Sequence, residues 1–382
     1  MSTNRDESVK DPTLYVGSND PNGSVKRKKH KKHHTIEQKM EPTVIPSPPP
    51  SIPVPVVKTD RFGFILTEKS ISPEERALQE KESRKEEERT RKWLEMFKKW
   101  SVYNTQMLSK LQERIQKGIP DIIRSKAWRL IIDPESLTIN PNERPTIDSY
   151  LSLGRSKCCD TIDVDLDRTM PQVLMFTKKE VRESLKRILY AYSNADAELG
   201  YTQGMAFSAA MLLSYMEESE AFWCFHKLMC SPRFSIRGYF LKGFPQLVLI
   251  NRVWDIIFKE KYKAIANHFV QQGVDHMIYT PSWFLTGFLN LGFPPAFRLH
   301  LFDRYIGFGT RSLLSFGLVI ISRHKDILIK SPFELLLPIV QKPSESERMN
   351  DWRYLIKKWD EHWITEKQYR AYFAKAGVQY FP

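Results

Sequence analysis

Signals that begin and end helices recur along this chain from residue 72 to its last residues. A Ser or Thr followed three residues later by Glu or Gln forms a capping box, which satisfies free N–H groups at a helix N-terminus. Such pairs are Ser72/Glu75, Thr177/Glu180, Ser331/Glu334 and Thr365/Gln368, and Gly377 stands where the last helix would end. Sustained alternation of apolar and polar residues, which is typical of strands, is hard to find. The sequence therefore predicts an all-α, multi-helix body with no internal repeat.

A helical lead-in is expected over residues 60–116, with a charged helix from Ser72 onward. Glu and Lys or Arg alternate four residues apart, as at Glu88/Lys92, which supports an exposed helix. The stretch runs towards Trp93, Phe97 and Trp100. We expect these aromatic side chains to dock the end of the helix on the main body.

Residues 1–59 have the composition of a disordered tail. A basic run, KRKKHKKHH, begins at Lys26 and ends at His34, and seven prolines lie between Pro42 and Pro55. Prolines lack a backbone N–H and favour an extended, solvated chain. The basic run could attract an anionic membrane surface, and a PxxP motif at residues 50–53 could dock an SH3-type partner. A plain linker is the alternative for both.

Length and composition limit the number of domains, the cellular setting and the kinds of partner that this protein can have. The 382 residues, 41% of them hydrophobic, suffice for two or three domains or one large domain with tails. The chain has no apolar run of 18 residues, and no apolar segment follows its first ten residues, so neither a membrane span nor a secretory signal is expected. Four cysteines favour a reducing, cytoplasmic setting. The net charge of +13 alone does not distinguish nucleic acid, membrane or protein partners.

Two clusters of possible metal ligands fail on spacing. Cys224, His226 and Cys230 lie in an aromatic helical stripe, and a structural zinc site would require four ligands in recognisable pairs. We interpret this stretch as a core helix with buried thiols. The acidic run at residues 160–168 matches three positions of a calcium loop, but Arg168 replaces the required Gly and Leu174 the required Glu. HExxH, GxSxG and Walker A motifs are absent, so the chain is not expected to hold a nucleotide itself.

Two short polar segments remain without an assigned role. In the acidic run, Arg168 is flanked by carboxylates, and an ordinary surface ion pair would explain it. The segment Gly200-Tyr-Thr-Gln-Gly204 forms a predicted turn between two helices. The side chain of Gln203 in this turn has two possible roles. It points outward, into solvent or into a partner, or its amide caps a helix.

Three segments of the chain resemble, in order, the signature motifs of TBC-domain Rab GTPase-activating proteins. The segments are KGIPDIIRSKAW (117–128), IDVDLDR (162–168) and YTQG (201–204). They match the Arg-x3-Trp, I-x-x-D-x-x-R and Y-x-Q motifs through Arg124 and Trp128, Ile162, Asp165 and Arg168, and Tyr201 and Gln203. The resemblance covers residues 117–341 and is greatest to the RN-tre-like branch. It implies a TBC domain over that range, followed by C-terminal helices over 342–382 that pack on it.

The resemblance also implies a division of roles. Arg168 would be an arginine finger and Gln203 a glutamine finger, both supplied in trans to a Rab-family GTPase in its GTP-bound form. Asp165 would orient Arg168, and Tyr201, Ile162 and Gly204 would support the two motifs. Arg124 and Trp128 would belong to the scaffold, as a charged anchor and a core aromatic residue on one helix. The chain would need no cofactor of its own, because GTP and Mg²⁺ belong to the partner GTPase.

The implied function is the acceleration of GTP hydrolysis by a Rab, and through it the regulation of vesicle traffic. The chain would be a catalytic activator of another enzyme rather than a hydrolase by itself. A TBC scaffold that binds a small GTPase without accelerating hydrolysis is the alternative, although the presence of both fingers argues against it. Nucleic acid is not an expected partner, because no helix-turn-helix, RRM, KH or zinc-finger signature occurs. The expected localisation is cytoplasmic, with peripheral association with endomembranes.

Overall fold

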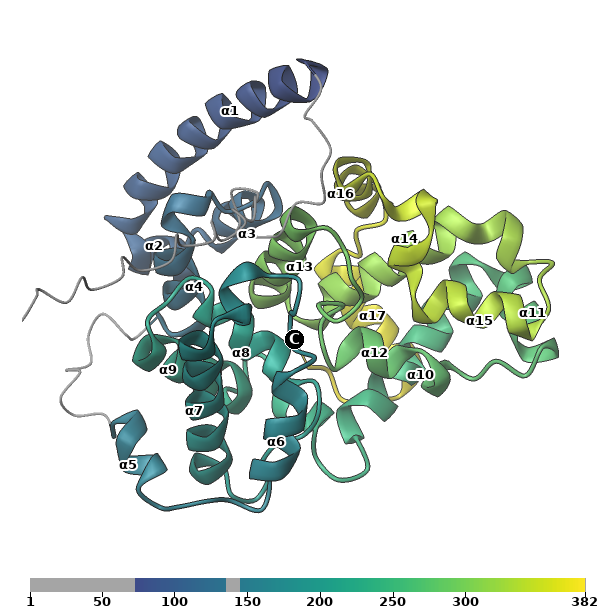
Figure 1. Ribbon diagram of the computed structural model, residues 1–382. Coiled ribbons are helices and arrows are strands. Elements are labelled where there is room, and N and C mark those ends of the chain that lie inside the picture. The colour runs from purple at the N-terminus through teal and green to yellow at the C-terminus, as the bar shows by residue number, and fades with distance from the viewer. Residues whose placement is uncertain (1–72, 135–144, 382) are drawn as a thin grey trace, which may run out of the picture. The chain divides into compact units, whose positions relative to one another are not determined.

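The computed structural model describes residues 73–134 and 145–381 of the chain, and these ranges contain helices and turns but no β-strand (Figure 1). The predicted all-α fold is therefore confirmed. The first helices are α1 (Pro73–Phe97), α2 (Trp100–Thr105), α3 (Leu108–Gln116), α4 (Arg124–Ile132), α5 (Ile147–Leu151), α6 (Cys159–Leu166), α7 (Lys179–Ala195), α8 (Met205–Leu213) and α9 (Glu218–Cys230). The later helices are α10 (Pro245–Lys261), α11 (Lys263–Gln271), α12 (Thr280–Phe284), α13 (Pro295–Phe308), α14 (Thr310–Leu328), α15 (Phe333–Gln341), α16 (Trp352–Glu361) and α17 (Glu366–Ala376). Short 3₁₀ turns lie between them at η1 (Asp121–Ile123), η4 (Leu174–Thr177), η5 (Ile236–Tyr239), η6 (His276–Ile278), η7 (Pro343–Glu345) and η8 (Glu347–Met349).

The lead-in helix α1 is charged along its length and docks through its C-terminal end. Trp93, Met96 and, at the start of α2, Trp100 are buried, as the sequence predicted for the two tryptophans. Further towards its N-terminus, Glu82 forms an ion pair with Arg353 of α16. Figure 1 shows α1 extending past α2 and α3. The helix is thus held to the body by its aromatic end and by polar contacts.

Helix α7 is the centre of the first group of helices. It packs against α5, α6, α8 and α9, and Figure 1 shows it between α6 and α9. Its buried residues follow the helical period that the sequence shows; they include Leu185, Ile188, Leu189 and Tyr192. Helix α8 is buried over nearly its whole length, which removes its apolar surface from water. These contacts fix the positions of α6 and of the turn before α8.

Helix α14 has the same central place among the later helices. It packs against α12, α13, α15 and α16, while α17 packs against α10. The core here is rich in aromatic rings, and Phe316 of α14 contacts Phe288, Phe297 and Trp359 edge-on or tilted.

The domain boundaries expected at residues 117 and 342 stay predictions. The tail expected over residues 1–59, with its basic run and its PxxP motif, lies outside the described residues.

The predicted helices begin at or within two residues of the expected positions, but the expected side-chain caps are not always formed. Thr365 and Gln368 form the expected capping box of α17, and Gly377 ends that helix at φ +63°. By contrast, the Thr177 hydroxyl donates to the carbonyl of Leu174 within η4, and α7 begins two residues later without a side-chain cap. Helix α15 is likewise uncapped by Ser331. Its first N–H, on Phe333, donates to the side-chain oxygen of Gln272 at 3.1 Å instead. Ser72, the expected cap of α1, lies outside the described residues.

The helix that carries the possible zinc ligands is α9. Cys224 is buried in the core, as predicted, but Cys230 is exposed, so the prediction of two buried thiols is wrong for that residue. Cys230 is the last residue of α9, where the helix reaches the surface.

No helix among the described residues has the length and apolar character required to cross a bilayer.

Candidate functional site

Arg168 lies just beyond the C-terminal end of α6, where a buried carboxylate holds it. Asp165 is 3% exposed, and one of its oxygens accepts a hydrogen bond from Nε of Arg168. The Arg168 side chain is itself 53% exposed. Because this contact uses only Nε, the N–H groups of both Nη atoms are left available to another molecule.

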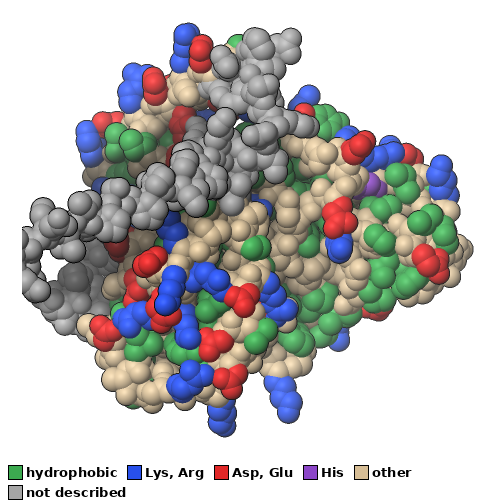
Figure 2. Space-filling model, viewed as in Figure 1, with side chains coloured by type: hydrophobic (Ala, Val, Ile, Leu, Met, Phe, Trp, Pro, Cys, Tyr) green, Lys and Arg blue, Asp and Glu red, His purple; other side chains and the backbone are tan. Residues whose placement is uncertain are grey.

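The other carboxylates of this segment have partners of their own. Asp163 forms an ion pair with Lys186 at 2.9 Å, and Asp167 pairs with Arg182. Figure 2 shows Lys and Arg side chains interspersed with Asp and Glu on the face over α6 and α7. An ordinary surface ion pair would leave both of its members exposed, whereas Asp165 is buried beneath Arg168. The Asp165–Arg168 pair therefore differs from its neighbours.

Tyr201 connects this pair to the turn that carries Gln203. The Tyr201 hydroxyl donates a hydrogen bond to the second oxygen of Asp165 at 2.5 Å. Burial and this hydrogen bond raise the pKa of Tyr201, so that the hydroxyl keeps its proton and acts as the donor. Ile162, fully buried one turn before Asp165, packs α6 on the core. The two polar segments singled out in the sequence thus meet at one carboxylate.

Gln203 is exposed at the tip of this turn. The next residue, Gly204, is the N-cap of α8 and has φ +106°, a conformation that side chains other than glycine rarely adopt. No hydrogen bond of the Gln203 amide is found within the described part of the chain, so it does not cap α8 there. Residues at both ends of the turn are buried, while the amide between them faces outward.

A contact that sequence reasoning missed joins the other end of α6 to the same turn. Cys158, the N-cap residue of α6, accepts a hydrogen bond from the backbone N–H of Tyr201 at 3.2 Å through its sulfur. Gly200 has φ +65°, and a Cβ at that position would lie only 2.7 Å from this sulfur. The turn is therefore attached to α6 at Cys158 and again at Asp165. No motif spacing in the sequence signals the Cys158 contact.

Replacing Gly200 with alanine is expected to destabilise the protein for two separate reasons. The left-handed backbone costs about 1–2 kcal/mol for a residue with a side chain, and the contact with Cys158 adds to it. Gly243 is a matched control, because it has φ +81° and a Cβ added there would meet no atom within 4 Å. In urea unfolding, Gly200→Ala should lose more stability than Gly243→Ala, and Cys158→Ala should recover part of the difference. Equal losses in the two glycine variants would contradict the close contact.

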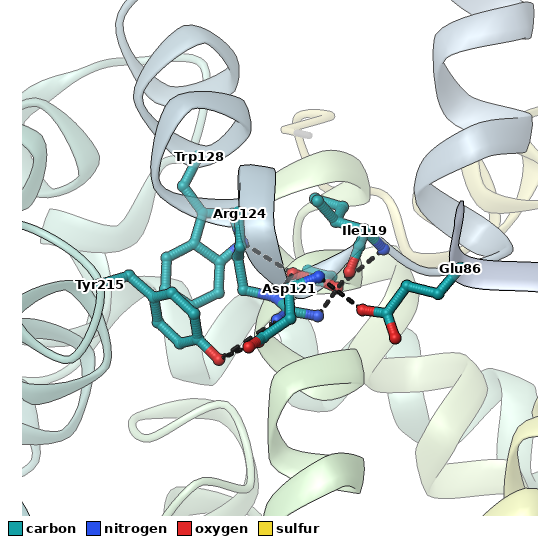
Figure 3. Close-up of polar contacts among 7 residues, drawn as sticks. Glu86, Ile119, Asp121, Arg124, Trp128 and Tyr215 are labelled. Atoms are coloured by element: carbon teal, nitrogen blue, oxygen red, sulfur yellow. Dashed lines mark hydrogen bonds and ion pairs between the residues drawn. The ribbon is translucent and has the colours of Figure 1, made fainter. Parts of the chain in front are cut away.

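Arg124 and Trp128 form a separate buried cluster around Asp303 of α13 (Figure 3). The indole N–H of Trp128 donates to Asp303 at 2.7 Å, and Nε of Arg124 donates to the same oxygen at 3.4 Å. Arg124 also contacts Asp121 and the Tyr215 hydroxyl. Burial opposes the charge on Arg124, but Asp303, Tyr215 and Asp121 outweigh it and raise the pKa of the guanidinium.

This cluster fastens α4 to α13 and to the lead-in helix. The backbone N–H of Ile119 donates to the second oxygen of Asp303 at 3.2 Å, and that of Asp121 donates to Glu86 of α1 at 2.8 Å. The structure does not bring Arg124 or Trp128 into contact with Arg168 or Gln203, and their role as scaffold residues stays a prediction. Asp303 and Tyr215 were missed in the sequence, since partners more than 90 residues away leave no local pattern. Asp121, only three residues before Arg124, was also not singled out.

The described residues thus form a helical domain that presents an arginine and a glutamine from two neighbouring segments on one buried support. The model of the Rab-GTPase-TBC domain family matches residues 121–329, more than half of the chain. The chain belongs to this family. The resemblance drawn from three short motifs is confirmed, whereas the RN-tre-like branch stays a prediction.

Curated relatives and solved structures agree with this assignment. The chain is 33% identical over 234 residues to the GTPase-activating protein GYP5 of Eremothecium gossypii, covering 61% of this chain and 27% of the relative. It is 28% identical over 319 residues to mouse TBC1 domain family member 10A, covering 81% and 61%. The chain therefore spans about a quarter of the first relative's length and about three fifths of the second's.

Two solved structures share the fold. The Chlamydomonas flagellar RabGAP TBC domain superposes with a TM-score of 0.59 at 20% identity, covering 79% of this chain and 98% of that one. The Ypt/Rab-GAP domain of Gyp1p superposes with a TM-score of 0.54 at 19% identity, covering 66% and 91%. At these identities the likeness establishes the helical architecture.

Proposed function

We propose that this chain accelerates GTP hydrolysis by a Rab-family GTPase, with Arg168 and Gln203 inserted into the partner's site. Membership of the Rab-GTPase-TBC family supports the class of partner, and relatives such as GYP5 are named as GTPase-activating proteins. The observation that carries the assignment of the fingers is the shared carboxylate of Asp165. It binds Arg168 with one oxygen and Tyr201, two residues before Gln203, with the other.

The chemistry of phosphoryl transfer suits these two side chains. Negative charge develops around the β–γ bridge and the γ-phosphate oxygens, and a guanidinium fork stabilises it. Arg168 reaches outward with both Nη groups while Asp165 holds Nε, so that little rearrangement is needed on binding. The amide of Gln203 can both accept from and donate to the attacking water, and so orient it in line. GTP and Mg²⁺ would belong to the partner, and the chain would contribute only these polar groups.

Single-turnover GTP hydrolysis with a panel of purified GTP-loaded Rabs tests this proposal. Acceleration of at least one Rab supports it. Binding of a GTP-loaded Rab without any acceleration would instead favour the non-catalytic scaffold. Acceleration of none, and binding of none, across a complete panel would contradict both functions.

Replacing Gln203 with alanine separates chemistry from folding. We expect the catalysed rate to fall by about 10²–10³, the usual loss when one positioned polar group is removed from a reaction centre. The melting temperature should stay nearly unchanged, because the exposed amide contributes no contact to the described core. Thr202→Ala, one residue earlier, controls for disturbance of the turn. An unfolded variant, or one with full activity, would mean that Gln203 is not a finger.

The expected contacts with a membrane and with an SH3-type partner depend on residues outside the described ranges. Like the GTPase-activating function, they are proposals. Attraction of the run from Lys26 to His34 to an anionic leaflet would raise the local concentration of the domain near a lipid-anchored Rab. Such attachment would be peripheral and would place the activity on endomembranes during vesicle traffic. A cytoplasmic setting is part of the same proposal, because four cysteines in 382 residues favour a reducing compartment.

A further inference from the structure

Two adjoining cavities lie between α1 and the rest of the domain. The first has a volume of about 420 Å³ and extends towards α13 and α16, with Gly118, His300 and Trp352 among its lining residues. The second, of about 430 Å³, lies between α1 and α3. Lys85, Arg89 and Lys117 line both, so the two form one continuous feature, which we call the α1 cleft. Each part has the size of a small-ligand site.

Basic side chains face each other across this cleft in two rows. Residues three or four positions apart lie on one face of a helix. The row on α1 consists of Lys81, Lys85, Arg89 and Lys92, and the row on α3 consists of Lys110, Arg114 and Lys117. Like charges on facing helices repel one another, and this repulsion persists unless anions lie between them.

The carboxylates of the cleft neutralise only part of these rows. Glu88 pairs with Lys92 at 2.5 Å, and Glu113 pairs with Lys117 at 2.5 Å and with Lys110 at 3.1 Å. The hydrogen bond from Lys117, followed by that from Lys110, lowers the pKa of Glu113 to about 2, which reflects the positive surroundings. In the first cavity, Glu82 is engaged by Arg353 and Glu86 by the backbone N–H of Asp121.

Three cations of the rows therefore remain without a carboxylate partner among the described residues. They are Lys81, Lys85 and Arg89, which form ion pairs with none of the acidic residues named above. In addition, Nη1 of Arg114 is buried and has no hydrogen-bond partner in the described part of the chain. A buried donor without a partner is costly, and the guanidinium of Arg114 otherwise lies over the ring of Tyr103, 5.8 Å from its centroid.

We propose that the α1 cleft binds a ligand that carries two or more phosphate groups on a compact polar frame. Two basic walls require anionic groups on two sides of the ligand, and the arginine forks match the oxygen geometry of phosphate. Soluble inositol polyphosphates and the headgroups of phosphoinositide lipids share this chemistry. The site is separate from Arg168 and Gln203, since neither residue lines the cleft.

Binding of the full chain to two probes tests the site and distinguishes the two sources. One probe is inositol hexakisphosphate, titrated in a calorimeter. The other is a phosphatidylcholine vesicle with phosphatidylinositol bisphosphate, compared by flotation with a vesicle of equal charge made with phosphatidylserine. Binding to the soluble probe alone indicates a free polyphosphate, and binding that favours the bisphosphate vesicle indicates the lipid headgroup.

A matched pair of variants ties the binding to the cleft. Lys85→Ala/Arg89→Ala removes two charges that line both cavities, whereas Arg84→Ala/Arg91→Ala removes two from exposed positions of the same helix that line neither. Both variants keep the basic run at residues 26–34, so any attraction by that run is common to them. We expect the first variant to bind at least about tenfold more weakly, because each lost contact is a charge-assisted hydrogen bond. The second should bind like the unmodified chain.

The outcomes decide the proposal in either direction. A loss confined to Lys85→Ala/Arg89→Ala, with an unchanged melting temperature in the absence of ligand, supports a site in the cleft. Equal losses in the two variants would indicate only general attraction of anions to a basic helix and would overturn it. So would the absence of binding to both probes at low salt, where electrostatic contacts are strongest.

Discussion

Arg168→Ala is expected to lower the catalysed rate of GTP hydrolysis by about 10³–10⁵, the usual contribution of an arginine supplied in trans. This loss corresponds to roughly 4–7 kcal/mol of transition-state stabilisation. The side chain is 53% exposed, and among the described residues its one hydrogen-bonded ion pair is with Asp165, so folding should be affected little. The measurement is single-turnover hydrolysis by a GTP-loaded Rab that the unmodified chain activates, together with a thermal melt of the variant.

Two further variants show whether the loss of activity is due to the guanidinium of Arg168 itself. Arg168→Lys should restore little activity, because an ammonium does not bridge two oxygens as a guanidinium does. Arg182→Ala is the matched control, since it removes another arginine that pairs with a carboxylate of the same segment, the exposed Asp167. It should retain most of the activity. If Arg168→Ala kept more than about a tenth of the activity, the role assigned to Arg168 would be wrong.

Trp128→Ala should have the largest effect on folding, with a loss of about 3–5 kcal/mol in the free energy of unfolding. The ring is fully buried and packs edge-on against Phe302 and Tyr215, with centroid distances of 4.8 and 5.0 Å. The substitution also removes the indole N–H that donates to Asp303. Urea unfolding followed by circular dichroism measures the loss.

Trp128→Phe divides this loss into its two parts. A phenylalanine ring keeps most of the packing but removes the N–H, so we expect a cost of about 1–3 kcal/mol. Protein of either variant that remains folded should still activate the Rab, because Trp128 contacts neither Arg168 nor Gln203. A cost below about 1 kcal/mol for Trp128→Ala would show that the ring is not part of the core.

Local patterns in the sequence predicted the architecture well because the forces behind them are local. The capping box of Thr365 and Gln368 joins residues three positions apart, and the buried face of α7 repeats every three or four residues. Such patterns depend on the geometry of one helix and need no knowledge of its neighbours. They failed at Thr177 and Ser331, where a 3₁₀ turn and the side chain of Gln272 replaced the expected caps.

For the candidate site, the motifs identified which residues to consider but not how they are joined. The sequence singled out Asp165, Arg168, Tyr201 and Gln203 by their order and spacing. It left open whether Arg168 formed an ordinary surface pair and whether Gln203 capped a helix. Those alternatives differ in burial, and burial depends on what packs around the segment. The structure shows Asp165 buried and the Gln203 amide exposed.

From the sequence alone it could be predicted that the body of this protein is helical, where four of its helices begin, and which family its motifs resemble. The packed structure was needed to show that one carboxylate holds both Arg168 and Tyr201, that the sulfur of Cys158 holds the backbone of the same turn, and that Asp303 joins α4 to α13. The physical reason is separation along the chain. Helix capping and helical periodicity act over three or four residues, whereas Asp165 and Tyr201 are 36 residues apart and Trp128 and Asp303 are 175 apart. Such partners meet only once α6, α7, α8 and α13 have packed into one core, and no local pattern records which of them will meet.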